Sequence, residues 1–174
     1  MQHRITGKKY DPLHSNHEQD DSDPFLVADR AYTHETAAYV KLAELQGGLI
    51  PKYYGSFSLS LSTDGAKSRD VRLILLEIVH GTRTMDLDPS KFTQPERQAI
   101  MKAVIDAEST IYTHDVAHGD IHPRNVIFAF LPPFGQARNI VVVDFGISCV
   151  NSSGSRMGEE FPLRGTNISV TAAD

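Results

Sequence analysis

Apolar residues recur at the spacing of a helix in two stretches of the chain. The first stretch covers residues 30–46, and the pair Gly47-Gly48 stops it. The second begins at Thr93-Gln94-Pro95-Glu96, which has the order of a capping box with proline in the first turn. We expect this second helix to end near His114, so the pattern predicts two helices in all.

The clearest strand is the continuous apolar and β-branched run Arg72–Val79, which Gly81 ends. Residues 50–57 predict a turn that leads into an earlier strand. The segment between them, residues 58–70, is rich in Ser, Asp and Gly, and we expect it to form a hairpin loop. The first half of the chain therefore predicts a small antiparallel sheet beside the 30–46 helix.

A second hairpin is predicted after the second helix. Its strands are the short apolar runs Val126–Phe128 and Ile140–Val143, with residues 129–139 as the connecting loop. The polar, acidic segment 14–24 predicts another loop, and the chain from Asn151 onward is rich in Ser and Gly with weak patterning. We find no internal repeat.

With 174 residues, 40% of them apolar, the chain suits one globular domain or two small lobes. Its formal net charge of −5 argues against non-specific binding to nucleic acid or to an anionic membrane. A single cysteine, Cys149, excludes an internal disulfide framework. The N-terminus lacks the apolar core of a signal peptide, and no run of about 18 apolar residues is present. We therefore expect a cytoplasmic or nuclear protein with no nucleic-acid or membrane partner.

The most informative polar residues lie between the second helix and the end of the second hairpin. From His118 to Asn125 the chain reads His-Gly-Asp-Ile-His-Pro-Arg-Asn, and Asp-Phe-Gly at 144–146 follows the last apolar strand. Phosphoryl transfer needs one carboxylate at the acceptor hydroxyl, and an amide and a second carboxylate for metal ions on the phosphates. Asp120, Asn125 and Asp144 supply these groups in this order.

Each of these residues also has a structural interpretation. An Asp that follows Gly is common in turns and helix caps, so Asp120 favours catalysis only as one of the set. His114, His118 and His122 are spaced four apart, but a glycine and a proline in this stretch break a helix, so we reject a zinc site. Arg124 is interpreted as a salt-bridge partner or a phosphate contact.

The pattern resembles the protein-kinase-like superfamily, and its His-Gly-Asp order is similar to the aminoglycoside and choline phosphotransferase branch. The resemblance implies an enzyme that uses ATP and Mg²⁺. It implies that Asp120 is the catalytic base, and that Asn125 and Asp144 hold metal on the nucleotide phosphates. It further implies that His118 contacts the backbone beside the Asp-Phe-Gly sequence.

The N-terminal part of the chain carries the rest of the resemblance. Residues 8–12, Lys-Lys-Tyr-Asp-Pro, resemble the strand end Lys-x-Tyr-Asp-Pro of fungal kinase-like proteins. This implies that Lys8 contacts the nucleotide phosphates and pairs with Glu35 on the first helix, with Lys9 as the alternative. It also implies that Phe145 packs under the helix that carries Glu35.

The fold that the resemblance implies is α+β, a two-lobed and incomplete protein-kinase-like fold. Residues 1–79 would form a partial N-lobe with an antiparallel sheet and one helix, 80–150 a partial helical C-lobe, and 151–174 a weakly ordered tail. The end of the N-lobe resembles a kinase hinge, which implies that backbone groups of Glu77 and Val79 meet the adenine. A Gly-rich loop and most of the C-lobe are missing, so we expect truncation at both ends and an apolar helix face left for a partner protein.

We interpret the chain as a phosphotransferase that moves the γ-phosphoryl group of ATP to a hydroxyl acceptor, with protein Ser/Thr favoured. Two alternatives stay open. A catalytically dead pseudokinase or scaffold would account for the missing Gly-rich loop. A small-molecule kinase of the choline or aminoglycoside type would account for the His-Gly-Asp order at 118–120.

Overall fold

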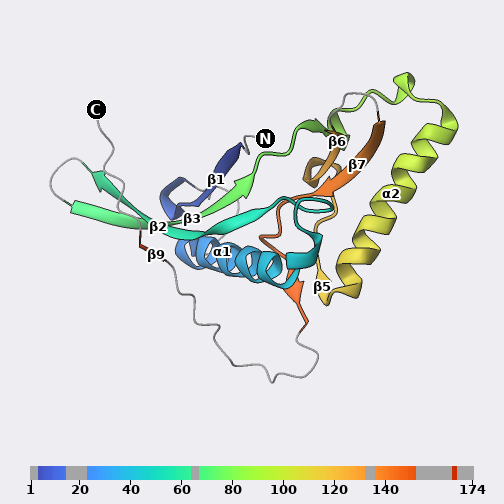
Figure 1. Cartoon of the computed structure of the whole chain (residues 1–174). Helices are drawn as coiled ribbons and strands as arrows, with labels where there is room; N and C mark the ends of the chain where they lie inside the picture. The colour runs from blue at the N-terminus through green and yellow to red at the C-terminus, as the bar shows by residue number, and fades with distance from the viewer. Residues whose placement is uncertain (1–3, 15–22, 64–66, 132–135, 152–165, 168–174) are drawn as a thin grey trace.

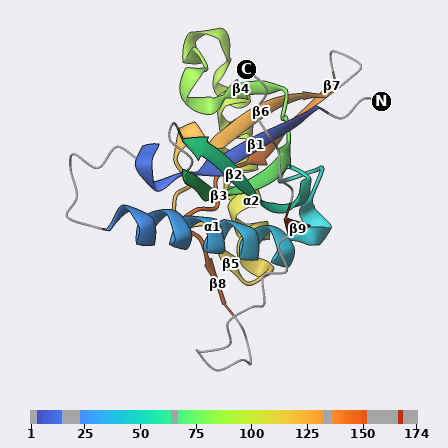
Figure 2. The same ribbon diagram turned by 90° about the vertical axis from the view of Figure 1, so that its left-hand side faces the viewer.

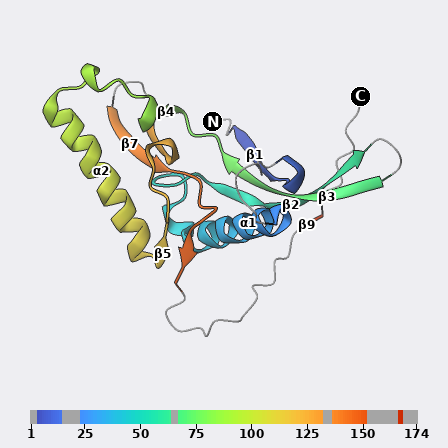
Figure 3. The same cartoon turned by 180° about the vertical axis from the view of Figure 1, so that it is seen from behind.

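The computed structural model describes residues 4–14, 23–63, 67–131, 136–151 and 166–167 of the chain. One helix lies against a mainly antiparallel sheet, and a smaller sheet with a second helix follows (Figure 1). The turned views show the first helix running along one face of the first sheet, and the second helix beside the second sheet at the other end (Figures 2 and 3). The predicted α+β class is confirmed.

The strands and helices are mostly longer than the apolar runs alone indicate. In chain order they are β1 (Ile5–Tyr10), α1 (Pro24–Lys41), β2 (Tyr53–Thr63), β3 (Lys67–Glu77), β4 (Gly81–Arg83), α2 (Gln94–Thr113), β5 (Val116–Ala117), β6 (Val126–Leu131), β7 (Gln136–Val142), β8 (Cys149–Val150) and β9 (Thr166–Asn167). Short 3₁₀ turns lie at Pro12–His14, Ala43–Leu45, Thr84–Asp86, Pro89–Lys91 and Pro123–Asn125.

The first sheet has the strand order β1-β3-β2-β9. β2 and β3 pair antiparallel along a long hairpin, with Thr63 opposite Lys67 at its tip. The prediction of a loop over residues 58–70 is therefore wrong. Serines in this segment alternate with Phe57, Leu59 and Leu61, and this period of two is the spacing of a half-buried strand.

Helix α1 begins at Pro24, before the predicted start at residue 30. The Asp23 side chain accepts a hydrogen bond from the Phe25 N–H, which caps the helix, and proline occupies the first turn. The helix ends at Lys41 and continues as the 3₁₀ turn before Gly47, so the predicted end at residue 46 is late. The sequence predicts that Asp23-Pro24 ends a loop, but the structure shows that these residues begin the helix.

The second sheet has the order β4-β6-β7. Gly81, predicted to break the preceding strand, also begins β4, where it lies opposite Ala129 of β6. A Cβ atom there would stand 2.5 Å from the Phe128 carbonyl oxygen, so glycine permits this close pairing. The strands β6 and β7 extend well into the predicted 129–139 connection.

Helix α2 matches its prediction and carries the expected capping box between Thr93 and Glu96. The two helices differ in burial. On α1 the buried side chains are Ala28, Tyr32, Glu35, Thr36, Ala38 and Tyr39. On α2 they are Ala107 and Ile111. One core runs from α1 and the first sheet through Phe145 to the buried faces of α2 and the second sheet, and α1 contributes more buried side chains to it than α2 does.

Three sequence predictions concern segments outside the described residues. They are most of the 14–24 loop (15–22), part of the connection between β6 and β7 (132–135), and most of the tail from 151 onward (152–165 and 168–174). Among the described residues, neither helix combines the length and apolar character that crossing a membrane requires.

Candidate active site

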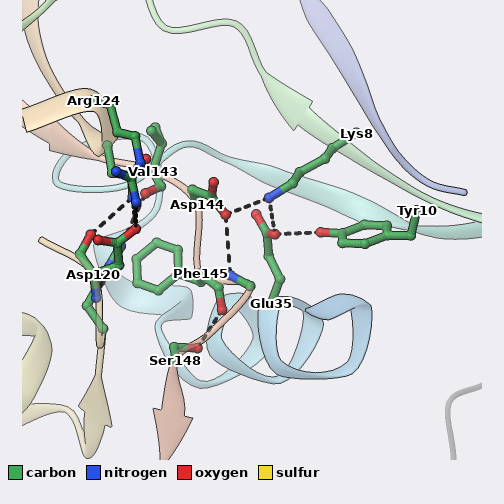
Figure 4. Close-up of polar contacts among 12 residues, drawn as sticks. Lys8, Tyr10, Glu35, Asp120, Arg124, Val143, Asp144, Phe145 and Ser148 are labelled. Carbon is green, nitrogen blue, oxygen red and sulfur yellow. Dashed lines mark hydrogen bonds and ion pairs between the residues drawn. The ribbon is translucent and has the colours of Figure 1, made fainter. Parts of the chain in front are cut away.

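Lys8 lies at the meeting point of three segments that are far apart in the chain. Its Nζ atom is 2.5 Å from Oε2 of Glu35 on α1 and 2.7 Å from Oδ1 of Asp144, just after β7 (Figure 4). Lys8 itself is on β1, opposite Ile74 of β3. The structure thus brings together three of the residues that the sequence selects. We call Lys8, Tyr10, Glu35 and Asp144 the lysine cluster.

The lysine cluster is buried on one side and open on the other. The Glu35 side chain is 0% exposed, whereas those of Lys8 and Asp144 are 36% and 51% exposed. Burial works to lower the pKa of Lys8, but the two carboxylates outweigh it and raise that pKa above its ordinary value. Burial works to raise the pKa of Asp144, but Lys8 outweighs it and lowers that pKa. Lys8 and Asp144 are therefore both charged at neutral pH, with Asp144 facing the open side.

Tyr10 belongs to the same cluster, and we did not select it from the sequence. Its hydroxyl donates a hydrogen bond of 2.5 Å to Oε2 of Glu35, the oxygen that Lys8 also contacts. The Lys8 ammonium lies 5.5 Å from the centre of the Tyr10 ring. Alternate residues of a strand face the same side, so the spacing Lys-x-Tyr on an expected strand was the available signal.

Asp144 has an uncommon backbone conformation for a residue other than glycine, with φ of 68°. The Gly146 N–H donates to Asp144 Oδ1 at 3.5 Å. Phe145 is fully buried and packs its ring against Tyr39 of α1, with ring centres 5.4 Å apart. The expected packing of Phe145 under the helix that carries Glu35 is confirmed, and it fixes the Asp-Phe-Gly turn to α1.

Asp120, Arg124 and Asn125 form a second group, which we call the aspartate loop. Oδ2 of Asp120 accepts from Arg124 Nη2 at 2.5 Å and from Asn125 Nδ2 at 2.9 Å. Asn125 Nδ2 also donates to the Asp120 carbonyl at 3.1 Å. Of the two interpretations of Arg124, the structure records the salt bridge. Both donors converge on Oδ2, and no described residue is hydrogen bonded to Oδ1.

His118 connects the aspartate loop to the backbone beside Asp144. Its Nδ1 accepts from the Asp120 N–H at 3.2 Å, and its Nε2 lies 3.1 Å from the Val143 carbonyl, the contact that the sequence predicts. The neutral ring with hydrogen on Nε2 satisfies both contacts. Burial lowers the pKa of His118, which keeps the ring neutral, although the Val143 carbonyl and nearby carboxylates oppose this shift.

Glu77 and Val79 lie at the end of β3 and in the link to β4. The Glu77 carboxylate accepts from the Lys52 N–H at 3.1 Å, and the Glu77 N–H donates to the Lys52 carbonyl at 2.9 Å. No hydrogen bond or ion pair joins either residue to the lysine cluster among the described residues. Their predicted role concerns backbone groups facing an adenine and stays a prediction.

A family model for the ABC1 atypical kinase-like domain matches residues 67–157, just over half of the chain. The chain belongs to this family. The matched residues include the aspartate loop and Asp144 but not Lys8 or Glu35. The prediction of the protein-kinase-like superfamily is therefore confirmed, with ABC1 as the matching family.

Curated relatives of this ABC1 kinase-like chain are protein kinases. It is 29% identical over 68 residues to serine/threonine-protein kinase 17A of Oryctolagus cuniculus, covering 39% of this chain and 16% of that protein. It is 28% identical over 87 residues to a calcium/calmodulin-dependent protein kinase of Metarhizium anisopliae, covering 49% and 22%. The chain therefore spans less than a quarter of the length of these relatives.

Solved structures share the fold. A crystal structure of WbdD matches with a TM-score of 0.55 at 13% identity, covering 86% of this chain and 29% of WbdD. A co-crystal structure of WbdD with the kinase inhibitor LY294002 matches with a TM-score of 0.52 at 14% identity, covering 86% and 30%. At such low identity these matches show the fold alone, and that fold is kinase-like.

Proposed function

We propose that the chain is an ATP- and Mg²⁺-dependent phosphotransferase that transfers the γ-phosphoryl group to a hydroxyl. The observation that carries this proposal is the position of the Lys8 ammonium, in contact with both Glu35 and Asp144 at the open side of the lysine cluster. A cation that faces solvent here and is fixed from behind by a buried carboxylate is suited to nucleotide phosphates. The ABC1 family match supports the same chemistry.

Two side chains could supply oxygen ligands to a magnesium ion. Asp144 offers a half-exposed carboxylate, and Asn125, whose Nδ2 donates to Asp120, has its amide oxygen left for a ligand. The described residues contain no group of three or more His, Cys, Asp or Glu side chains that could hold a metal ion. Mg²⁺ commonly takes one or two protein oxygens and completes its shell with phosphates and water. When bound, the ion would neutralise charge on the phosphates.

The chain's own residues have separate tasks in this proposal. Lys8 orients the α- and β-phosphates, and Glu35 holds Lys8 in place. Asp120 receives or orients the proton of the acceptor hydroxyl through Oδ1, because Arg124 and Asn125 occupy Oδ2. Because both hydrogen bonds reach the same oxygen, Oδ2, they hold the Asp120 carboxylate in one orientation, with Oδ1 left for the acceptor.

The remaining assignments rest on the resemblance. Backbone groups of Glu77 and Val79 would meet the adenine at the boundary between an N-lobe (1–79) and a C-lobe (80–150). A protein Ser/Thr hydroxyl is the favoured acceptor, supported by the two relatives named as protein kinases. A small alcohol of the choline or aminoglycoside type is the alternative, favoured by the His-Gly-Asp order.

We also propose that the protein acts in the cytoplasm or nucleus. ATP is available there, and an exposed free thiol such as that of Cys149 suits a reducing compartment.

A thermal-shift titration with ATP, with and without Mg²⁺, tests the proposal. Ligand binding to the folded state raises the melting temperature by mass action. We expect a metal-dependent rise in the parent and its loss in Asp144→Ala. Asp106→Ala is the matched control, because Asp106 is an exposed carboxylate that also pairs with a lysine, Lys102. A parent that melts cooperatively without any shift would contradict the proposal.

A second candidate function is that of a non-catalytic binding module. Helix α2 exposes Met101 and Ile105. A groove of about 330 Å³ lies between α2, the segment before it and residues 121–126, and it is lined by apolar residues such as Leu87, Phe92 and Val104. Apolar surface of this kind favours contact with another protein. Absence of both a nucleotide shift and phosphoryl transfer would favour this candidate.

A further inference from the structure

Tyr10 and Lys8 share one acceptor atom. Both are on β1, two residues apart, and each donates a hydrogen bond of 2.5 Å to Oε2 of Glu35 (Figure 4). The other carboxylate oxygen, Oε1, is buried and has no hydrogen-bond partner among the described residues. The charge of Glu35 is therefore stabilised at a single oxygen by two donors, and Tyr10 supplies one of them.

Burial makes this second donor important. The Glu35 side chain is 0% exposed, so water does not replace a lost hydrogen bond. A buried carboxylate that loses one of its two donors is held less firmly in place. A displaced Glu35 carboxylate would contact Lys8 less well, and Lys8 would then turn to Asp144 and to solvent.

The Tyr10 ring is itself held firmly. Its side chain belongs to the core, with 7% of the residue exposed, and it packs edge-on against Tyr32 with ring centres 5.5 Å apart. Tyr32 comes from α1, the helix that carries Glu35. A hydroxyl presented by a ring packed against the same helix has little freedom to leave the carboxylate.

We propose that Tyr10 is a positioning residue that fixes the Glu35 carboxylate and, through it, holds Lys8 at the position where phosphates would bind. In this proposal Tyr10 acts through Glu35 and not by contact with the nucleotide or a metal. Its effect on nucleotide affinity rests on the proposed function, but its effect on Lys8 is a property of the protein without ligand.

Tyr39 provides the matched control for the hydroxyl group. It lies one turn after Glu35 on α1, is 0% exposed, and its hydroxyl has no hydrogen-bond partner among the described residues. Tyr39→Phe and Tyr10→Phe each remove one buried hydroxyl beside Glu35 and keep the ring. A merely structural role for Tyr10 predicts similar results for the two variants, whereas the proposal predicts that they differ.

The first test measures the reactivity of Lys8 with an amine-acylating reagent, located by mass spectrometry. Lys9 is the internal reference, because its side chain is 38% exposed against 36% for Lys8 and pairs with Asp11. We expect Tyr10→Phe to raise the labelling of Lys8 relative to Lys9 at least three-fold, which is about 0.7 kcal/mol. Tyr39→Phe should leave the ratio unchanged. An unchanged ratio in a folded Tyr10→Phe protein would overturn the proposal.

A second variant shows whether Tyr10 acts through Glu35. Glu35→Gln keeps the shape of the side chain but removes its charge, and should also raise the labelling of Lys8. Adding Tyr10→Phe to Glu35→Gln should then cause no further rise, because the carboxylate that Tyr10 fixes is already gone. A further rise would overturn the proposal, since Tyr10 would then act on Lys8 directly. A further rise in the Glu35→Gln background would overturn the proposal even if Tyr10→Phe alone fails to fold.

The nucleotide test compares ATP with adenosine, which lacks the phosphates. Tyr10→Phe should weaken ATP binding in the presence of Mg²⁺ about ten-fold, which is about 1.4 kcal/mol, and leave adenosine binding unchanged. Equal loss for both ligands would contradict a positioning role. A parent that binds neither ligand contradicts the proposed function, and the labelling ratio then decides the role of Tyr10 independently.

Discussion

The lysine cluster and the aspartate loop are built in different ways. Lys8 meets Glu35 across 27 residues of chain and Asp144 across 136. Asp120 meets Arg124 and Asn125 across only 4 and 5 residues. The lysine cluster therefore exists only when β1, α1 and the end of β7 have packed together, whereas the aspartate loop is closed by its own hydrogen bonds.

The difference in construction separates two kinds of effect. Glu35 is part of the core, so a change there disturbs both packing and charge. The Asp120 and Arg124 side chains are 27% and 51% exposed, so a change there removes a chemical group with little loss of packing. Substitutions in the lysine cluster should therefore lower the free energy of unfolding, whereas substitutions in the aspartate loop should mainly lower the rate of phosphoryl transfer.

The largest expected effect is on the aspartate loop. Asp120→Asn should lower the rate of phosphoryl transfer about 10² to 10⁴-fold while the nucleotide-induced thermal shift persists, because the group that receives the hydroxyl proton is lost. Asp86→Asn is the matched control, since Asp86 is an exposed carboxylate paired with Arg83 at 2.8 Å. Transfer by Asp120→Asn at the parental rate would show that Asp120 is not the base.

The lysine cluster is tested by removing its buried carboxylate. Glu35→Ala should lower the free energy of unfolding by about 2 to 4 kcal/mol, because the partners Lys8 and Tyr10 both lose their acceptor. Urea denaturation measures this loss, with the exposed Glu44→Ala as control. Equal stability of the two variants would show that the buried carboxylate of the lysine cluster does not stabilise the fold, contrary to the difference described between the cluster and the aspartate loop.

The conformation of the aspartate loop depends on Gly119. Its φ is +80°, and a Cβ atom there would lie 3.0 Å from the Ile147 carbonyl oxygen. Gly119→Ala should therefore cost about 1 to 3 kcal/mol of stability. Gly48→Ala is the comparison, since Gly48 has no positive φ and its nearest contact is 3.7 Å away. If both variants melt alike, the loop is less constrained than its geometry indicates.

The smallest expected effect depends on pH and on His118, which joins the two groups. Burial lowers the pKa of His118 below its ordinary value of 6.5. As the pH falls through this range, His118 therefore takes up a proton in the unfolded chain before it does so in the folded protein. Stability should therefore decline from pH 7 to pH 5.5, and this decline should be smaller in His118→Gln than in His122→Gln. His122 is exposed. Equal slopes for both variants would contradict a buried neutral ring.

The aspartate loop could be predicted from the sequence because its signal is local. His118, Asp120, Asn125 and Asp144 stand in a fixed order that carries the resemblance, and the resemblance implies the contact of His118 with the backbone beside Asp144. Lys8 and Glu35 could be paired only through a resemblance, since neither has a local pattern of its own. Tyr10 was missed because its function lies in a contact with another element.

The errors in secondary structure have a common physical cause. The Ser-rich composition of residues 58–70 predicts a loop, whereas their period of two predicts a strand, and pairing with β3 supplies the backbone hydrogen bonds whatever the side chains. The polar segment before it makes Asp23-Pro24 resemble the end of a loop, although the same residues form a capped first turn. In both places the local sequence carries a strand or helix-start signal, and the polar composition of the segment hides it.

The contact between Lys8 and Asp144 also has a consequence for synthesis. Ribosomes add about 5 to 20 residues per second, so the 136 residues that separate the two take roughly 7 to 27 s to make. During that interval Lys8 and Glu35 can already pair, while the second carboxylate has yet to emerge. The nascent chain can therefore form the contact between Lys8 and Glu35 early, but the lysine cluster is complete only after Asp144 has left the exit tunnel.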